Sequence, residues 1–158
     1  MAPKGLKCFK EKIPMVRLAF EKMYCLRGTS KTKVSTAKDV VELMTRIYGC
    51  AAQERVYSVL LNSVNEIIGI QEISEGGLSS TQVDPRVVWS GALTAGAASI
   101  LLVHNHPSGN IEPSQQDREL TKALVDGSKT LGIRVLDHVI IGGNGTYSSF
   151  VDLGLMPQ

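Results

Sequence analysis

From Thr36 onward the chain alternates segments of helical character with short strand-like runs, and this alternation limits the fold more than any other feature. Apolar residues at helical spacing, or a capping pattern, indicate three helices: 36–48, 84–97 and 114–131. Runs of mainly apolar and β-branched residues indicate four strands: 55–61, 66–73, 99–103 and 133–141. Strands that alternate with helices predict an α/β fold, and the early hairpin predicts a mixed β-sheet packed between helices.

Two of the predicted helices have well-marked ends. Asp84 followed by Pro85 is an N-cap with a first-turn proline, whereas Ser114 opens the third helix and Gly132 ends it. The inner face of this third helix is predicted to carry four residues: Leu120, Ala123, Leu124 and Leu131. The glycine-rich segment 142–145 indicates a hairpin-like turn rather than a phosphate loop, because no helix start follows it.

Charge divides the chain near residue 35. Residues 1–33 hold nine Lys/Arg and two Glu, a net charge of +7, which leaves −5 for residues 34–158. We therefore expect a basic N-terminal tail and helix over 1–35, with helical spacing at 14–27, followed by one metal-binding domain over 36–158. The basic segment is interpreted as a solvated helix and tail, and the alternative is an arm that contacts nucleic acid or an acidic partner.

The bulk composition excludes several classes of protein. The first residues lack an apolar targeting core, and aliphatic runs stay as short as Ile100–Val103, so a cytoplasmic protein without membrane contact is expected. The three cysteines, Cys8, Cys25 and Cys50, are odd in number and form no C-x-x-C motif. This argues against a disulfide framework or a thiolate zinc site, so a metal would have to use histidine and carboxylate.

The segment 103–117 contains the residues that point to chemistry. Side chains at positions i and i+2 of an extended chain face the same side, so His104 and His106 can present both imidazoles to one point. Asp117 can face the same point from the first turn of the following helix. Two imidazoles and one carboxylate leave the fourth position of a tetrahedral zinc ion open, which is typical of catalytic sites. Taken alone, the histidine pair is incidental in many strands, and Ser114-x-x-Asp117 is a helix capping box.

These residues resemble a known signature. H-x-H-P followed by S-x-x-D, with 11 positions from His106 to Asp117, is the JAMM signature, and His-Asn-His-Pro-Ser-Gly with Asp137-His138 narrows the similarity to the RadC-like branch. The similarity runs from about Ala52 to Leu155. It implies the JAB1/MPN fold, a cytidine-deaminase-like sandwich.

The resemblance also implies roles for individual residues. His104, His106 and Asp117 correspond to ligands of a Zn²⁺ ion, and Ser114 corresponds to a hydroxyl that supports the oxyanion. The remaining active-site group of the family is a glutamate on an upstream element, and Glu54 fits it, 50 positions before His104. Three other glutamates compete for this role: Glu66, Glu72 and Glu75. For His138, a buried, hydrogen-bonded core histidine is the first interpretation, and a binding role at the rim of the site is the second.

The resemblance implies a zinc-dependent metallohydrolase, with a peptide or isopeptide bond as the substrate. The alternative is a DNA-associated repair or recombination factor in which the metal domain binds or cleaves nucleic acid, and a third reading is a non-catalytic scaffold. RadC-like proteins typically carry a helix-hairpin-helix region ahead of this domain. The 35 residues here are too few for it, so we do not expect their DNA-repair role to transfer.

Overall fold

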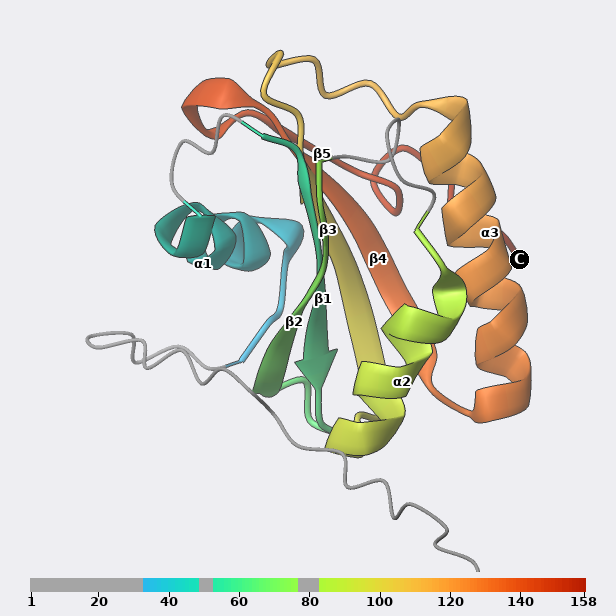
Figure 1. Ribbon diagram of the computed structural model, residues 1–158. Helices are drawn as coiled ribbons and strands as arrows, with labels where there is room; N and C mark the ends of the chain where they lie inside the picture. Colours follow the sequence, from blue (N-terminus) through green and yellow to red (C-terminus); the bar gives the residue numbers. More distant parts are fainter. Residues whose placement is uncertain (1–32, 49–52, 77–82) are drawn as a thin grey trace, which may run out of the picture.

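A five-stranded mixed β-sheet forms the middle layer of the protein (Figure 1). The computed structural model describes residues 33–48, 53–76 and 83–158. In chain order the elements are α1 (Ala37–Tyr48), β1 (Arg55–Leu61), β2 (Ile67–Glu75), α2 (Pro85–Ala95), β3 (Ser99–Asn105), α3 (Gln115–Leu131), β4 (Arg134–Ile141), the 3₁₀ turn Gly143–Gly145 and β5 (Tyr147–Ser149).

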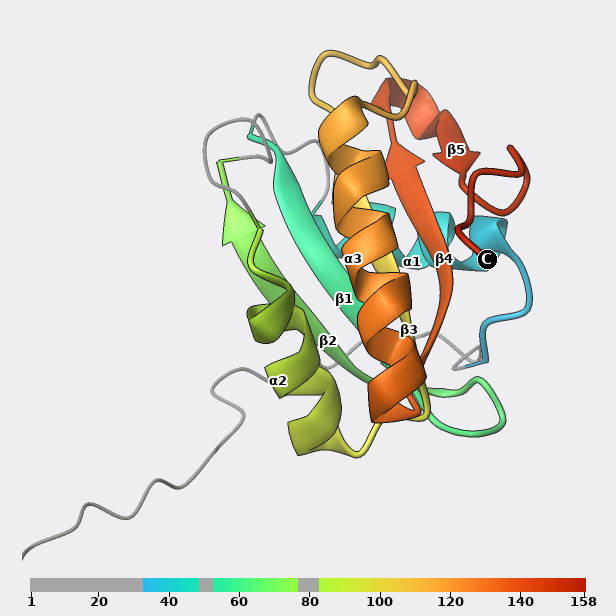
Figure 2. The same cartoon turned by 90° about the vertical axis from the view of Figure 1, so that its right-hand side faces the viewer.

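The strand order is β2-β1-β3-β4-β5, and every pairing is antiparallel except that of β3 with β4. The two parallel strands are joined by α3, which crosses over one face of the sheet (Figure 2). Parallel neighbours require such a crossover, because a short turn can only join antiparallel strands. The predicted α/β class and the mixed sheet are therefore confirmed.

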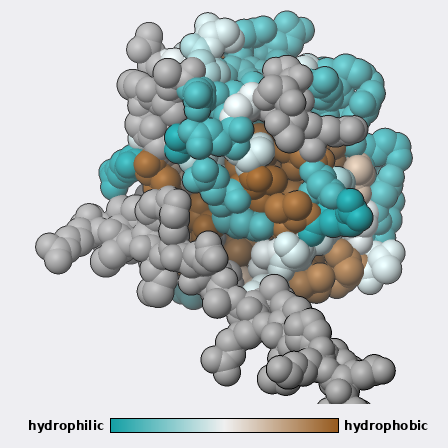
Figure 3. All heavy atoms as spheres, viewed as in Figure 1, coloured by the Kyte–Doolittle hydropathy of each residue, from teal (hydrophilic) through white to brown (hydrophobic). Residues whose placement is uncertain are grey.

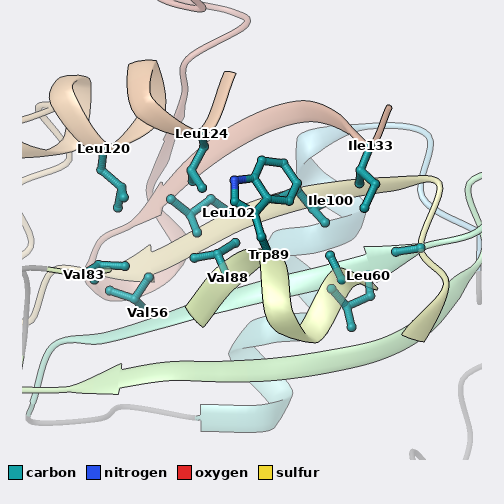
Figure 4. Close-up of a cluster of buried hydrophobic side chains, with 12 residues drawn as sticks. Val56, Leu60, Val83, Val88, Trp89, Ile100, Leu102, Leu120, Leu124 and Ile133 are labelled. Atoms are coloured by element: carbon teal, nitrogen blue, oxygen red, sulfur yellow. The ribbon is translucent and has the colours of Figure 1, made fainter. Parts of the chain in front are cut away.

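Helices cover both faces of the sheet. In Figures 1 and 2, α1 lies on one face, whereas α2 and α3 lie on the other. Figure 4 shows the core under α2 and α3, where Trp89 lies among aliphatic side chains that include Leu102 and Leu124. A second apolar cluster, which includes Val40 and Met44, fills the space between α1 and the sheet. With apolar layers on both faces, the central strand β3 is buried along its whole length.

Local sequence signals explain where the helices begin and end. The Asp84 side chain accepts a hydrogen bond from the backbone of Arg86 ahead of α2, and Gly96 ends that helix in the left-handed conformation. Gly132 ends α3 in the same way, with φ of 68°. At α1, Thr36 and Asp39 exchange side-chain and backbone hydrogen bonds, as expected for a cap. Among the described residues, no helix is long and apolar enough to cross a membrane.

Several predicted details were wrong. The third strand continues to Asn105, so His104 lies within the sheet rather than beyond it, and the short strand β5 was not predicted. Ala123 is exposed and Leu131 is 36% exposed, because Thr121 and Val125 share the inner face of α3 with Leu120 and Leu124.

Apolar residues also reach the surface near the middle of the face in Figure 3, where hydrophilic residues surround them.

Other predictions are confirmed or stay open. The 142–145 turn joins β4 and β5 as a hairpin, as predicted. The basic tail, the helix predicted at 14–27 and the three cysteines lie outside the described residues. The domain boundary at residue 35 therefore stays a prediction.

Candidate metal centre

The candidate site lies at the end of β3, on the face of the sheet covered by α3. His104 is completely buried, and its partner in the antiparallel pairing with β1 is Val56. His106 follows the strand, and its backbone N–H donates to the carbonyl of Ile141 at the end of β4. The two histidines are thus held by the central strands of the sheet, at the end where the α3 helix begins.

The Nε2 atom of His104 is the centre of the constellation. It lies 2.9 Å from Nε2 of His106 and 3.3 Å from Oδ1 of Asp117. Zinc bonds of about 2.0–2.1 Å at tetrahedral angles require ligand atoms roughly 3.3 Å apart. The second separation matches this value, and the first is somewhat shorter. The sequence-predicted His106 and Asp117 therefore both approach Nε2 of His104. Among the described residues, the groups of three ligand atoms that lie within 4.8 Å of one another are His104 and His106 with Glu54, and His104 and Asp117 with His138.

The two carboxylate oxygens of Asp117 have different surroundings: one caps α3, and the other faces the candidate site. Its Oδ2 accepts hydrogen bonds from the backbone N–H of Ser114 at 2.8 Å and from the Ser114 hydroxyl at 2.6 Å, which completes the capping box of α3. Its Oδ1 is buried, and among the described residues nothing donates a hydrogen bond to it. A buried carboxylate oxygen without a donor is costly unless a cation satisfies it. Cap and ligand are therefore compatible roles of the same side chain.

His106 presents an unprotonated nitrogen to the same point. Its Nδ1 lies 2.5 Å from the backbone carbonyl of Asn110, and a carbonyl can only accept, so Nδ1 carries the proton. In the neutral ring, Nε2 then carries a lone pair. This lone pair and Oδ1 of Asp117 are both acceptors facing Nε2 of His104, an arrangement that a bound cation would stabilise.

The chemistry of this donor set fits zinc. Burial lowers the pKa of His104 to about 4, against the opposing attraction of the Asp117 carboxylate and with a smaller lowering contribution from His106. His104 is therefore neutral at neutral pH, and its contact with Asp117 is not a salt bridge between two charges. Neutral imidazoles and a carboxylate are the forms in which these side chains bind zinc.

Glu54 joins the site from the segment that precedes β1. Its carboxylate lies within 4.8 Å of ligand atoms of His104 and His106. The Asn105 side chain holds this segment in place, since it accepts from the N–H of Arg55 at 2.8 Å and donates to the carbonyl of Gln53 at 3.0 Å. The backbone carbonyl of Glu54 also accepts from Gly76.

The competing glutamates lie elsewhere. Glu66 hydrogen-bonds Asn62 in the turn after β1, at the end of that strand remote from Glu54. Glu75 forms a salt bridge with Arg55, 2.5 Å between the charged atoms, and Glu72 is exposed on β2. Of the four glutamates considered from the sequence, Glu54 is the one that belongs to the cluster with His104 and His106.

His138 lies on the other side of His104. It is completely buried on β4, where its ring stacks on Phe150 with centroids 4.7 Å apart. Its Nε2 lies 2.8 Å from Nδ1 of His104, and its Nδ1 lies 2.7 Å from the Thr121 hydroxyl. Burial lowers the pKa of His138 well below its ordinary value. His138, His104 and Asp117 form a second group of closely spaced ligand atoms, so His104 is shared between two clusters.

Sequence reasoning missed three contributors to this geometry: Asn105, Asn110 and Thr121. The Asn105 side chain hydrogen-bonds the backbone on either side of Glu54, and the Asn110 backbone carbonyl accepts from the His106 ring. No residue pattern in the sequence predicts such contacts between side chains and backbone. Thr121 had a detectable signal, because it lies four positions after Asp117 and therefore on the same face of a helix. The first interpretation of His138, as a buried and hydrogen-bonded core histidine, agrees with its position.

We expect the loop that orients His106 to be sensitive to Gly142. A Cβ atom at this position would lie 2.9 Å from the backbone oxygen of Gly109 and 2.7 Å from the side chain of Ile111. Gly142→Ala should therefore displace the 109–111 loop and destabilise the protein by roughly 1–3 kcal/mol, as overpacking typically does. Denaturant unfolding measures the loss of stability, and zinc titration measures the disturbance of His106.

Gly143→Ala is the matched control for this prediction. A Cβ atom at Gly143 would meet nothing within 4 Å, although the residue is the direct neighbour of Gly142. Equal stability and zinc affinity in the two variants would show that the close approach at Gly142 does not constrain the loop.

Comparison with known proteins agrees with the geometry. A family profile described as a RadC-like JAB domain matches residues 34–155. A UPF0758 protein of Caldanaerobacter subterraneus is 47% identical over 109 residues, which cover 69% of this chain and 47% of the relative. UPF0758 proteins of Clostridium acetobutylicum and Methanosarcina mazei are 37% and 41% identical, over 87% and 80% of this chain and 59% and 55% of their own lengths.

The chain thus spans about half the length of the curated relatives it matches. The profile covers the sheet, the three helices of the described part of the chain and each residue of the candidate site. The chain belongs to the RadC-like JAB domain family.

Proposed function

We propose that this chain is a zinc-dependent metallohydrolase that cleaves peptide or isopeptide bonds. The observation that carries the proposal is the approach of Nε2 of His106 and of Oδ1 of Asp117 to Nε2 of His104, with the carboxylate of Glu54 within 4.8 Å of ligand atoms of both histidines. Three protein ligands leave one tetrahedral position for water or substrate, which distinguishes catalytic from structural zinc sites.

Zinc held by these residues would supply Lewis-acid chemistry and lower the pKa of water to about 7. Glu54 then takes a proton from the attacking water as its oxygen adds to the carbonyl carbon of the substrate. The same carboxyl group returns the proton to the amine nitrogen as the C–N bond breaks. Peptide hydrolysis needs one such proton carrier near the reacting atoms, and Glu54 is the carboxylate in reach of both histidines.

Ser114 is proposed to stabilise the oxyanion that forms on the carbonyl oxygen. In the structure its hydroxyl donates to Oδ2 of Asp117 at 2.6 Å. To donate to a substrate, the hydroxyl has to rotate away from this carboxylate. The backbone N–H of Ser114 continues to donate to Oδ2 at 2.8 Å, and Oγ of Ser114 continues to accept from the backbone N–H of Asp117 at 3.2 Å. Turning the hydroxyl proton therefore leaves both hydrogen bonds of the capping box in place.

We predict that the purified chain binds about one zinc ion, because two imidazole nitrogens and one carboxylate oxygen satisfy three of the four positions of one tetrahedral ion. Elemental analysis after metal-replete expression measures the content, and dialysis against a chelator should remove the ion and lower the melting temperature. A chain that holds no zinc under these conditions would contradict the proposed site.

Hydrolysis assays distinguish this function from the nucleic-acid alternative. We expect peptide or isopeptide substrates to be cleaved in a zinc-dependent manner, whereas single- and double-stranded DNA and RNA stay intact. The net charge of −5 on residues 34–158 supports this expectation, because phosphate backbones are bound through basic surfaces. Zinc-dependent cleavage of nucleic acid, with peptides untouched, would reverse the assignment.

A further inference from the structure

We propose that His138 and Thr121 are positioning residues that keep the proton of His104 on Nδ1 and so leave its Nε2 free to bind the metal. This inference deepens the proposed function, since it rests on His104 being a metal ligand. The contacts that carry it form a chain of hydrogen bonds from the backbone of Asp117 to the ring of His104.

The direction of this chain is set by Thr121. Its hydroxyl lies 2.6 Å from the backbone carbonyl of Asp117 and 2.7 Å from Nδ1 of His138. A hydroxyl has one proton and a carbonyl can only accept, so both contacts are hydrogen bonds only if the hydroxyl donates to the carbonyl. Thr121 then has only lone pairs to offer His138, whose Nδ1 must carry the proton.

The same reasoning continues through His138. The ring is completely buried, which disfavours its charged form, and a neutral imidazole protonated on Nδ1 has a lone pair on Nε2. This Nε2 lies 2.8 Å from Nδ1 of His104 and therefore accepts its proton in a hydrogen bond. His104 is thus protonated on Nδ1, and its Nε2 faces Nε2 of His106 at 2.9 Å and Oδ1 of Asp117 with a lone pair. Three facing acceptors need a cation between them, so this tautomer belongs to the metal-bound protein.

The position of His138 excludes it from the metal-binding side of the ring. His138 contacts Nδ1 of His104, whereas His106 and Asp117 both contact Nε2 on the opposite side. Proteins commonly fix the tautomer of a ligating histidine by a hydrogen bond to its other nitrogen, most often with a carboxylate or carbonyl as acceptor. Here a second histidine, itself oriented by a threonine, performs this task.

The chain of hydrogen bonds also connects the two sides of the site. It starts at the Asp117 backbone on α3, passes through His138 on β4 and ends at His104 on β3. Stacking of His138 on Phe150 restricts rotation of the intermediate ring. One helix and two neighbouring strands of the sheet therefore contribute to the orientation of His104.

Substitutions of Thr121 test the proposal with little change in shape. Thr121→Val keeps the branched side chain but has no acceptor for Nδ1 of His138. That ring should then move its proton to Nε2, where it meets Nδ1 of His104 and forces the His104 proton onto Nε2. Zinc affinity should fall by roughly 10–100-fold, the usual effect of losing such an outer partner. Thr121→Ser retains the hydroxyl and should bind zinc within about threefold of the unchanged chain.

Two measurements on the full chain are required. Long-range ¹H–¹⁵N correlation spectra of the zinc-loaded protein report which nitrogen of each histidine is protonated, and chelator competition reports zinc affinity. We expect Nδ1–H for His104 and His138 in the unchanged chain and in Thr121→Ser, and loss of Nδ1–H at His138 in Thr121→Val. A merely structural role of Thr121 would change the melting temperature without moving the proton of His138.

Nε2–H on His104 in the unchanged chain would overturn the proposal. So would a Thr121→Val variant with unaltered tautomers and zinc affinity. The spectra of the unchanged chain test the assignment even if that variant fails to fold. Failure of the proposed function is distinguishable, because a zinc-loaded chain with the expected tautomers that cleaves no peptide or isopeptide bond would refute the proposed activity and leave the hydrogen-bond chain intact.

Discussion

Glu54→Gln should retain its zinc ion and lose most of its hydrolytic activity. Glutamine has nearly the same shape as glutamate and leaves all three candidate ligands in place, but it cannot take a proton from water. General acid–base catalysis typically contributes 10²–10⁴-fold, so kcat on a peptide substrate should fall by about that factor. Steady-state kinetics and metal analysis on the same preparation separate the loss of the base from the loss of the metal.

Glu66→Gln is the matched control for this experiment. It makes the same chemical change in the turn after β1, where the carboxylate bonds Asn62 and lies at the opposite end of the strand from Glu54. Its kcat should therefore stay close to that of the unchanged chain. Full activity in Glu54→Gln together with inactivity in Glu66→Gln or Glu72→Gln would show that another glutamate is the base, although the zinc site could still stand.

Much of the fold could be predicted because its signals are local. Helix caps such as Asp84 and Ser114 and the left-handed Gly132 act within a few residues of the chain, and the structure places each as predicted. The strand β5 escaped prediction because Tyr147–Ser149 is three residues long and largely polar. The pairing of β5 with β4 depends on the hairpin turn between them, so β5 cannot be predicted from the periodicity of its own three residues.

In the candidate site, too, the residues close together in the sequence could be predicted, and those brought together by strand pairing could not. His104, His106 and Asp117 lie within fourteen residues, so strand alternation and one helical turn were enough to predict that His106 and Asp117 both lie near His104. The proximity of Glu54 depends instead on the pairing of β1 with β3, which brings together residues 50 positions apart. No spacing rule fixes such a long-range register, and only the resemblance to the family indicated this residue.

The contact between His138 and His104 was beyond sequence reasoning for a further reason. It depends on the parallel register of β3 and β4, which contains an irregularity after Ile100. A shift of one residue in a strand turns a side chain to the opposite face of the sheet. The sequence therefore predicted a buried, hydrogen-bonded histidine at position 138 but could not identify its partner.

Asp117→Ala should abolish stoichiometric zinc binding and, with it, all zinc-dependent hydrolysis. The substitution removes one of three candidate protein ligands, so zinc affinity should fall by more than the roughly 10–100-fold that follows from losing an outer hydrogen-bond partner. It also removes the Oδ2 atom of the α3 capping box, which is worth about 1 kcal/mol, together with the buried Oδ1, which is costly without a cation. The stability of the zinc-free protein should therefore fall by no more than about 1 kcal/mol. Thermal unfolding without zinc measures the loss of the cap, and chelator competition measures the loss of the ligand. If Asp117→Ala bound zinc as tightly as the unchanged chain, the buried Oδ1 would not be a ligand, and the proposed site would have to be rebuilt around Glu54, His104 and His106.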